Sequence, residues 1–443
     1  MYKNVLSINN QMELFEKSLP FGDRLNRHNR WIQLATLVDW EGFERSYAQK
    51  FSHTGRPALS ARIVIGALIL KHILEVSDEE LTQQLRENPY MQFFIGLERF
   101  QDDPPFHSST LSRVRERLGE KDFEAFEHYI ITDLVSKKLI KPKGLLVDAT
   151  VFENEITFPT DCGLLNKARQ FCVKKIKKLS KIVGRKVRTY CRVAQQSYLS
   201  FTKKRKKTTK QIRHMQKSLL QYLRRNIRQL TELIDDVEQQ GHVVSQNIKE
   251  TFATVKQIYR QQKQMYDQHI HSIENRIVSL SKPYLRPIVR NKSGKKVEFG
   301  PKVTASMVDG YLLFDHLGYE NYNESGLLSE NVERFRKRFG KDPKYVSMDQ
   351  LYGSRSNRAY LKREQIRTSV KPLGRRRHGQ SNQAERRLRR QKQKERNQIE
   401  GGFGVSKRSY LLGKVRAKNS KTEYSWIRMG LLGQNLMTAA QRV

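Results

Sequence analysis

The stretch VEFGPKVTASMVDGYLLFDHLG, which begins at residue 297, places the strongest constraint on how this chain folds. Apolar and polar residues alternate on both sides of its Asp309-Gly310 pair. An Asp-Gly pair between two such runs is the strongest short-range signal for a β-hairpin. We therefore expect antiparallel strands at Val297–Ser306 and Tyr311–Asp315.

Two other short apolar runs contain an aspartate near their ends. GLLVDATV, at residues 144–151, indicates a buried strand that carries Asp148, and KYVSMD indicates a strand that ends at Asp349. An amphipathic helix is expected at Gly326–Phe339, between the hairpin and the second run. The helix SRSNRAYLKREQ, the strand IRTSVKP and a helix with Glu400 follow. This order of elements suits an α/β fold in which helices flank a mixed sheet.

Residues 1–138 indicate an all-α region. LSARIVIGALILKHIL is an apolar helix that suits a domain core and is shorter than the ~20 residues of a membrane span. Ser77, followed by Glu80 three residues later, forms the capping-box pattern that begins a new helix. Several short helices with tight turns, one of which carries Arg113, suit a helix-turn-helix DNA-binding domain. The alternative is an ordinary helical bundle whose arginines are solvated.

The chain becomes helical and basic between about residues 164 and 280. Apolar residues recur at near-heptad spacing from Ile212 to Val237 and again from Phe252 to Leu280. The turn between the two series contains Gln240-Gly241. Two matched series around a glycine turn predict an antiparallel α-helical hairpin. The following stretch, LRPIVRNKSGKK, reads as a linker.

The run KKRKK precedes this predicted hairpin. Contacts of such a run with DNA phosphates would add affinity without reading the base sequence. A solvated coiled coil is the alternative. The candidate DNA-binding residues in the run are Lys203, Lys204 and Arg205.

The charge of the chain indicates a polyanionic partner. Its 84 Lys and Arg against 45 Asp and Glu give a formal net charge of +39, which points to nucleic acid. An anionic membrane surface is the other candidate, but no apolar run approaches the length of a span. The N-terminal sequence does not have the pattern of a signal peptide. Three cysteines without a CxxC pair fit a reducing cytoplasm and offer no zinc site.

Three acids are candidates for one catalytic site. Asp148 and Asp349 lie near the C-terminal ends of predicted strands, where α/β sheets collect their ligand sites. A helix is expected to bring Glu400 to them, and the Gly401-Gly402 pair predicts a break that turns Lys407 back to the same place. Three carboxylates suit two Mg²⁺ or Mn²⁺ ions and in-line phosphoryl transfer on DNA. Taken singly, the acids have simpler explanations, such as a turn cap or an i,i+4 ion pair with Arg396.

The chain resembles bacterial insertion-sequence transposases of the DDE type. VDATVFEN resembles the strand with the first acid of that family, and YVSMDQLYGSRSN resembles the strand with the second. Arg396, Glu400 and Lys407 have the spacing that the family shows around its third acid, although Gln393 stands where the family has a tyrosine. SDEELTQQLRENPYMQFFIGLE and FHSSTLSRVRERLG resemble the helical region that precedes the catalytic core.

The resemblance implies a ribonuclease H-like catalytic domain at residues 144–160 and 290–443. The helical DNA-binding domain would be residues 1–138, and a basic helical insertion would occupy residues 161–289. Asp148, Asp349 and Glu400 would hold the metal ions, while Arg396 and Lys407 would contact phosphates. Further arginines that would follow flanking or target DNA are Arg375, Arg376 and Arg377.

The expected partner is double-stranded DNA, both the terminal inverted repeats of the element and the target. The resemblance also implies a homodimer on DNA in the bacterial cytoplasm, close to the nucleoid. The expected activity is cleavage at the element ends and transfer of the 3′-hydroxyl into target DNA. A structure-specific nuclease and a domesticated, non-catalytic DNA-binding protein are the alternatives; the intact triad speaks against the latter.

Overall fold

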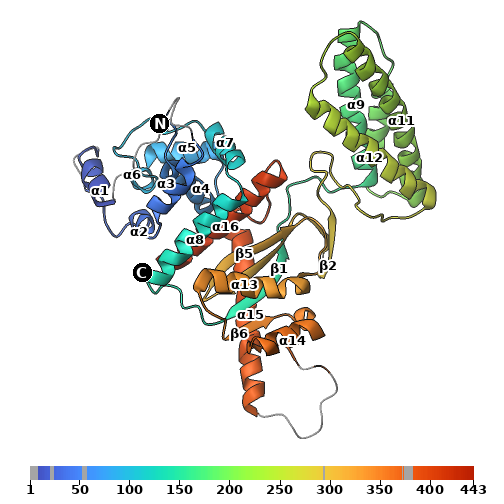
Figure 1. The fold of residues 1–443 in the computed structure, drawn as a ribbon. Coiled ribbons are helices and arrows are strands. Elements are labelled where there is room, and N and C mark those ends of the chain that lie inside the picture. Colours follow the sequence, from blue (N-terminus) through green and yellow to red (C-terminus); the bar gives the residue numbers. More distant parts are fainter. Residues whose placement is uncertain (1–7, 20–23, 52–56, 293–294, 372, 374–382) are drawn as a thin grey trace. The chain divides into compact units, whose positions relative to one another are not determined.

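The computed structural model of this 443-residue chain describes residues 8–19, 24–51, 57–292, 295–371, 373 and 383–443. The chain forms two compact units (Figure 1). Unit 1 combines Met1–Asn154 with Pro301–Val443, and unit 2 is Glu155–Gly300. Within the described ranges, no helix combines the length and the apolar character that a membrane span requires.

Unit 1 contains a five-stranded mixed sheet with the order β5-β4-β1-β6-β7. The pairs β5–β4 and β4–β1 are antiparallel, whereas β1–β6 and β6–β7 are parallel. The strands are β1 (Leu145–Val151), β4 (Lys302–Val308), β5 (Tyr311–Gly318), β6 (Tyr345–Met348) and β7 (Arg367–Thr368).

The predicted Asp-Gly hairpin is confirmed as β4–β5. Asp309 and Gly310 both adopt left-handed backbone angles, with φ of 50° and 87°, as a tight turn between twisted strands requires. The predicted first strand began too early, because Lys295–Phe299 forms a separate strand, β3. This strand pairs with β2, Pro287–Lys292, so the expected linker at Leu285–Lys296 is also wrong.

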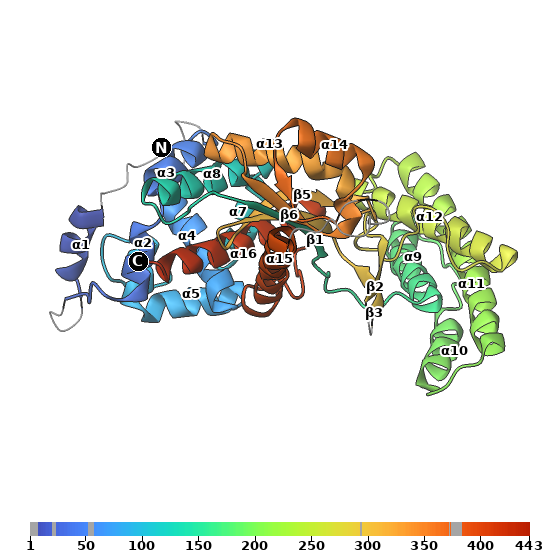
Figure 2. The same cartoon turned by 90° about the horizontal axis from the view of Figure 1, so that it is seen from below.

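Helices cover both faces of the sheet, as the sequence predicted. Figure 2 shows α13 and α14 on one side and α15 and α16 on the other. Successive residues of a strand point to opposite faces; Ser306 of β4 therefore faces α13, and Met307 faces α15. The helices are α13 (Leu328–Phe339), α14 (Arg355–Arg363), α15 (Gln383–Ser409) and α16 (Ser420–Ala440).

The N-terminal region is all-helical, as predicted, and it shares a hydrophobic core with the C-terminal helix. Ser60 caps the apolar helix α4, which packs against α16. The eight helices that the structure describes there are α1 (Ile8–Glu16), α2 (Arg30–Thr36), α3 (Trp40–Ala48), α4 (Ala61–Leu74), α5 (Asp78–Glu87), α6 (Pro89–Phe94), α7 (Ser109–Arg117) and α8 (Glu120–Ser136).

In its described residues, unit 2 is a bundle of four helices together with the β2–β3 hairpin. The predicted helical hairpin exists as α11 and α12, with Gly241 in the turn at φ 78°. The prediction missed that α9 packs along α11 and shares its apolar core. It also extended the second helix too far, because His269 turns left-handed and ends it. The helices are α9 (Asp161–Val183), α10 (Cys191–Lys203), α11 (Thr209–Gln239) and α12 (Gln246–Gln268).

Candidate active site

The sheet places Asp148 and Asp349 side by side. Strands β1 and β6 are parallel neighbours, and Val147 pairs with Met348. The next residue of each strand is an aspartate. Asp148 is the middle residue of β1 rather than its end, because β1 continues along β4 after β6 has stopped. The two aspartates therefore lie where β6 ends beside β1.

Each aspartate is fixed by a local hydrogen bond. The Asp148 carboxylate accepts from the backbone N–H of Ala149 at 2.8 Å, and its side chain is 18% exposed. Asp349 caps the 3-10 helix η3, Gln350–Tyr352, by accepting from the N–H of Gln350 at 2.5 Å. Both carboxylates are partly open to solvent.

Helix α15 brings the third acid to the sheet. Ile399 and Phe403 are buried, so the side of the helix that carries them packs on the strands. Glu400 lies beside them with half of its side chain exposed. Arg396, one turn earlier, pairs with Glu400 at 2.8 Å (Nη2 to Oε1) and approaches Asp148 at 3.7 Å (Nη1 to Oδ2). The arginine thus connects the first and third predicted acids.

The Arg396 guanidinium has donor capacity left over. Its side chain is only 14% exposed, and its Nε is buried without a hydrogen-bond partner. Lys407 follows Arg396 by three helical turns on the same helix, and its Nζ lies 5.7 Å from the ring centroid of Phe152, just beyond β1. Lys407 therefore lies on the same side of α15 as Arg396, beside the residue that follows β1.

The Gly401-Gly402 pair does not break the helix, which is a correction to the sequence analysis. Helix α15 continues through both glycines. A Cβ at Gly402 would lie 2.6 Å from Met307 Cε and 3.0 Å from Leu312 Cδ1, whereas a Cβ at Gly401 would meet nothing within 4 Å. Gly402 instead allows α15 to approach the β4–β5 hairpin closely.

The carboxylates suit a hard cation in their chemistry, since Mg²⁺ and Mn²⁺ prefer oxygen ligands. Among the residues that the structure describes, no group of three His, Cys, Asp or Glu side chains is placed to hold a metal ion. Asp148 and Asp349 are neighbours, and Arg396 pairs with Glu400. The carboxylates therefore suit the ion by their chemistry, but in this structure the three are not gathered around one point, and Arg396 contacts two of them.

The other predicted DNA-binding residues are distributed over the chain. Arg113 is exposed on α7 and donates to Ser109, whereas Arg115 of the same helix is buried in an ion pair with Asp78. Lys203, at the end of α10, and the adjacent Lys204 and Arg205 are all exposed. The remaining three, Arg375, Arg376 and Arg377, lie outside the described residues.

Tyr352 is a residue of the site that sequence reasoning missed. It is almost fully buried at the end of η3, and its hydroxyl has no hydrogen-bond partner. Burial raises the pKa of Tyr352, and the carboxylates of Glu324 and Asp148 raise it further. Its position three residues after Asp349 is the sequence feature that could have indicated a place in the site.

Two acids near the predicted triad have structural partners. Glu153 forms an ion pair with Lys414 at 2.5 Å. Asp315 is buried and accepts from Ser306, from Asn331 at 2.7 Å and from Arg338 at 2.7 Å. These contacts give both acids structural roles outside the predicted triad.

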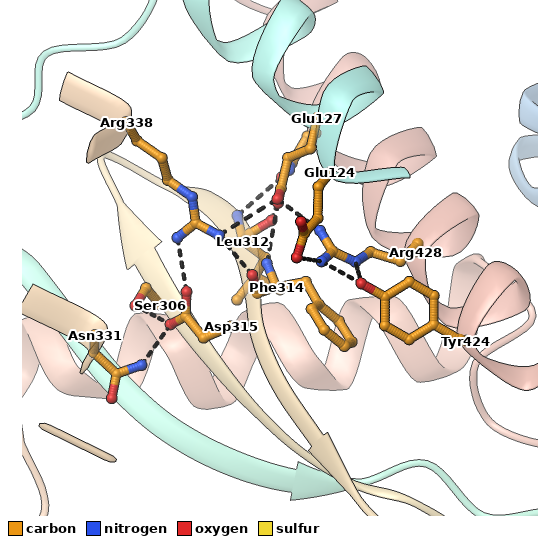
Figure 3. A network of polar contacts seen from close by, with 11 residues as sticks. Glu124, Glu127, Ser306, Leu312, Phe314, Asp315, Asn331, Arg338, Tyr424 and Arg428 are labelled. Atoms are coloured by element: carbon orange, nitrogen blue, oxygen red, sulfur yellow. Dashed lines mark hydrogen bonds and ion pairs between the residues drawn. The ribbon is translucent and has the colours of Figure 1, made fainter. Parts of the chain in front are cut away.

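Figure 3 shows how the Asp315 contacts extend across unit 1. Arg338 also reaches Glu127 of α8, which pairs with Arg428 of α16 at 2.8 Å. The Arg428 guanidinium lies 3.9 Å from the Phe314 ring centroid. Buried charges are stable when they are paired in this way. The network joins one face of the sheet to the helices that surround it.

Comparison with known proteins identifies two regions of the chain. Residues 19–117 match the family described as Transposase domain (DUF772), and residues 346–437 match the Transposase DDE domain. The second region includes Asp349 and Glu400, while Asp148 lies outside both.

A protein of Rhizobium meliloti, described as uncharacterized protein ORF8 in nfe locus, is 34% identical over 165 residues. The alignment covers 36% of this chain and 80% of that protein. No solved structure matches this chain. The two family matches confirm the resemblance that the motifs indicated, and the chain belongs to the insertion-sequence DDE transposases.

Proposed function

We propose that this transposase cuts DNA at the ends of its element and transfers the freed 3′-hydroxyl into target DNA. The placement of Asp148 beside Asp349 on parallel strands carries the proposal, together with the contacts that Arg396 makes with both Asp148 and Glu400. The strand order, with three antiparallel and then two parallel strands, supports a ribonuclease H-like catalytic core.

Asp148, Asp349 and Glu400 would hold two Mg²⁺ or Mn²⁺ ions. When bound, such ions activate an attacking water or hydroxyl and stabilise the leaving oxygen of a phosphodiester. The sheet fixes the first two carboxylates through the β1–β6 pairing and their backbone hydrogen bonds. Glu400 is the more exposed ligand, so its position depends on Arg396 and on the packing of α15.

Arg396 would contact a DNA phosphate near the cleaved bond. A guanidinium has five N–H donors in a planar fork, which matches phosphate geometry. Arg396 uses some of them on Asp148 and Glu400, while its Nε remains without a partner. Lys407 would add a second phosphate contact on the same side of α15.

The domain roles follow from the same proposal. Residues 1–138 would bind DNA, residues 144–160 and 290–443 would catalyse, and residues 161–289 would add a basic insertion. The DNA would be the terminal repeats and the target. Because two element ends must be joined together, we expect a homodimer on DNA.

The test is an assay with the purified chain, DNA carrying its element ends, a target plasmid and Mg²⁺. We expect cleavage followed by joining in the wild type and loss of both in Asp349→Ala. Asp342→Ala is the matched control, since Asp342 is an exposed aspartate paired with Arg336, and this variant should stay active.

The outcomes separate the candidate functions. Absence of metal-dependent cleavage in the wild type, or unchanged cleavage in Asp349→Ala, would contradict the proposal. Cleavage that is never followed by joining would favour a structure-specific nuclease. Tight DNA binding without cleavage would favour a non-catalytic DNA-binding protein.

A further inference from the structure

Unit 2 contains a long segment without a single acid. Residues 162–231 include 22 Lys and Arg and no Asp or Glu. They form α9, α10 and most of α11. By contrast, residues 1–138, which the sequence analysis assigned to DNA binding, contain 18 Lys and Arg against 20 Asp and Glu. The excess positive charge of the chain is therefore not in its N-terminal helices.

Most of these cations are exposed and available. Among the described residues, only Arg185 and Arg228 of this segment form ion pairs, both with acids at the C-terminal end of α11. We call the exposed and half-buried cations of residues 162–231 the basic surface. Its members from α9 to the start of α10 include Lys174, Lys177, Lys178, Lys181, Lys186, Arg188 and Arg192.

The ring of Tyr190 contacts two arginines of the basic surface. The guanidinium carbons of Arg188 and Arg225 both lie 4.5 Å from the centroid of its ring. Arg188 precedes α10 and Arg225 belongs to α11, so the ring brings together cations from two elements. Tyr190 itself is 39% exposed and adopts the left-handed conformation, with φ 54°. Such a conformation in a tyrosine is uncommon and concentrates at functional positions.

Further cations surround this cluster. The pKa of the Cys191 thiol is lowered, mainly by a hydrogen bond with Thr189 and in addition by Lys177 and Arg169. Arg169 is almost fully buried and donates to Asn166 at 2.9 Å (Nη2 to Oδ1). Like charges that are held close together repel one another, and a bound anion removes that repulsion.

The dimensions and the chemistry of the basic surface fit duplex DNA. Helix α9, with 23 residues at ~1.5 Å each, is about 34 Å long, roughly one helical turn of DNA. Arginines that are pre-ordered on a ring match phosphate oxygens in a bidentate manner. We propose that the basic surface binds the phosphate backbone of duplex DNA independently of sequence, with Arg188 and Arg225, held by Tyr190, at its centre.

This inference rests on DNA being the substrate of the proposed transposase, but it does not require cleavage. The test measures the affinity of the full chain for a duplex without element ends at several salt concentrations. Each phosphate contact contributes about 0.9 to the slope of log affinity against log salt. Arg188→Gln/Arg225→Gln should therefore reduce the magnitude of that slope by about 2.

A second double variant is the matched control. Lys249→Gln/Lys263→Gln removes the same charge from α12 of the same unit, where both lysines are paired with acids. We expect the wild-type slope from this control. Tyr190→Phe should bind as the wild type, whereas Tyr190→Ala should bind more weakly with its slope retained, because both arginines remain but are no longer ordered.

Three results would overturn the inference. These are equal slopes for the two double variants, wild-type affinity in Tyr190→Ala, and binding to phosphatidylserine vesicles but not to duplex DNA. If Arg188→Gln/Arg225→Gln cleaves DNA normally and binds the duplex as the wild type does, this inference is wrong and the catalytic proposal is unaffected. If the wild type does not cleave DNA but the double variant shows the predicted change in the salt dependence of binding, only the catalytic proposal is wrong.

Discussion

Arg396, to which we assign a phosphate contact, also makes a structural contact. The simplest explanation of Arg396 and Glu400 in the sequence was an i,i+4 ion pair, and that pair is present. The same guanidinium also approaches Asp148, which is nearly 250 positions earlier in the chain. A charge-balancing contact therefore keeps two of the proposed metal ligands together.

His72 makes the stability of unit 1 depend on pH. Burial is the main cause that lowers its pKa to about 3, while the hydrogen bond that its Nδ1 donates to the Tyr410 carbonyl opposes the shift. Between pH 6.5 and about 3, the unfolded chain therefore binds a proton that the folded chain does not. The stability that this histidine contributes is present above the unfolded pKa and is lost as the pH falls.

We predict that acid destabilises the wild type more than His72→Gln, which keeps a donor for Tyr410 but does not titrate. From pH 7 to pH 5, the wild type should lose about 2 kcal/mol more in its free energy of unfolding, at ~1.4 kcal/mol per pH unit below pH 6.5. Urea unfolding at the two pH values measures this difference. Parallel losses in both proteins would show that His72 is not the titrating group.

At the scale of elements, the position of α15 on the sheet decides whether Glu400 reaches Asp148. The two adjacent glycines of this helix differ in their surroundings: Gly402 faces Met307 and Leu312, while Gly401 faces open space. An ideal helix position favours alanine over glycine, but only where a side chain has room.

We predict opposite effects for substitutions at these neighbouring positions. Gly401→Ala should stabilise the protein by about 0.5–1 kcal/mol through helix propensity. Gly402→Val should destabilise it by about 1–3 kcal/mol through overpacking against β4–β5, and it should also slow DNA cleavage. Thermal unfolding and the cleavage assay measure both effects. A stable, fully active Gly402→Val variant would show that close packing of α15 is not required.

At the scale of the whole molecule, unit 2 is inserted at one point of the sheet, between the end of β1 and the start of β4. Val151, at the end of β1, pairs with Lys302 at the start of β4, and the N–H of Phe152 donates to the Pro301 carbonyl at 3.1 Å. Unit 2 is therefore inserted between two residues that are already neighbours. A short turn can join such strands without unit 2.

We predict that a chain in which a short Gly-Ser turn replaces residues 155–300 still folds as unit 1. Its circular dichroism should show the remaining helices, and its thermal unfolding should stay cooperative. Its affinity for duplex DNA should become much less sensitive to salt, since the basic surface has been removed. An aggregated or unfolded product would show that unit 1 depends on the insertion.

The sequence by itself determined the local elements and the chemistry. The Asp309-Gly310 turn, the strands with Asp148 and Asp349 and the helix with Glu400 all appear where the residue pattern predicted them. Local signals of this kind act over a few residues, so they can be read from the sequence. The family also followed from short motifs of this kind.

Only the tertiary structure decided how these elements meet. The parallel pairing of β1 with β6, the passage of α15 through two glycines and the packing of α9 on α11 depend on contacts between distant parts of the chain. Gly402 looked like a helix break because glycine has a low helix propensity, yet close approach to Met307 explains it. Arg115 lies two positions after Arg113 in a basic helix, yet it is buried in an ion pair with Asp78. Burial and pairing between distant residues override local preference, and they are visible only in three dimensions.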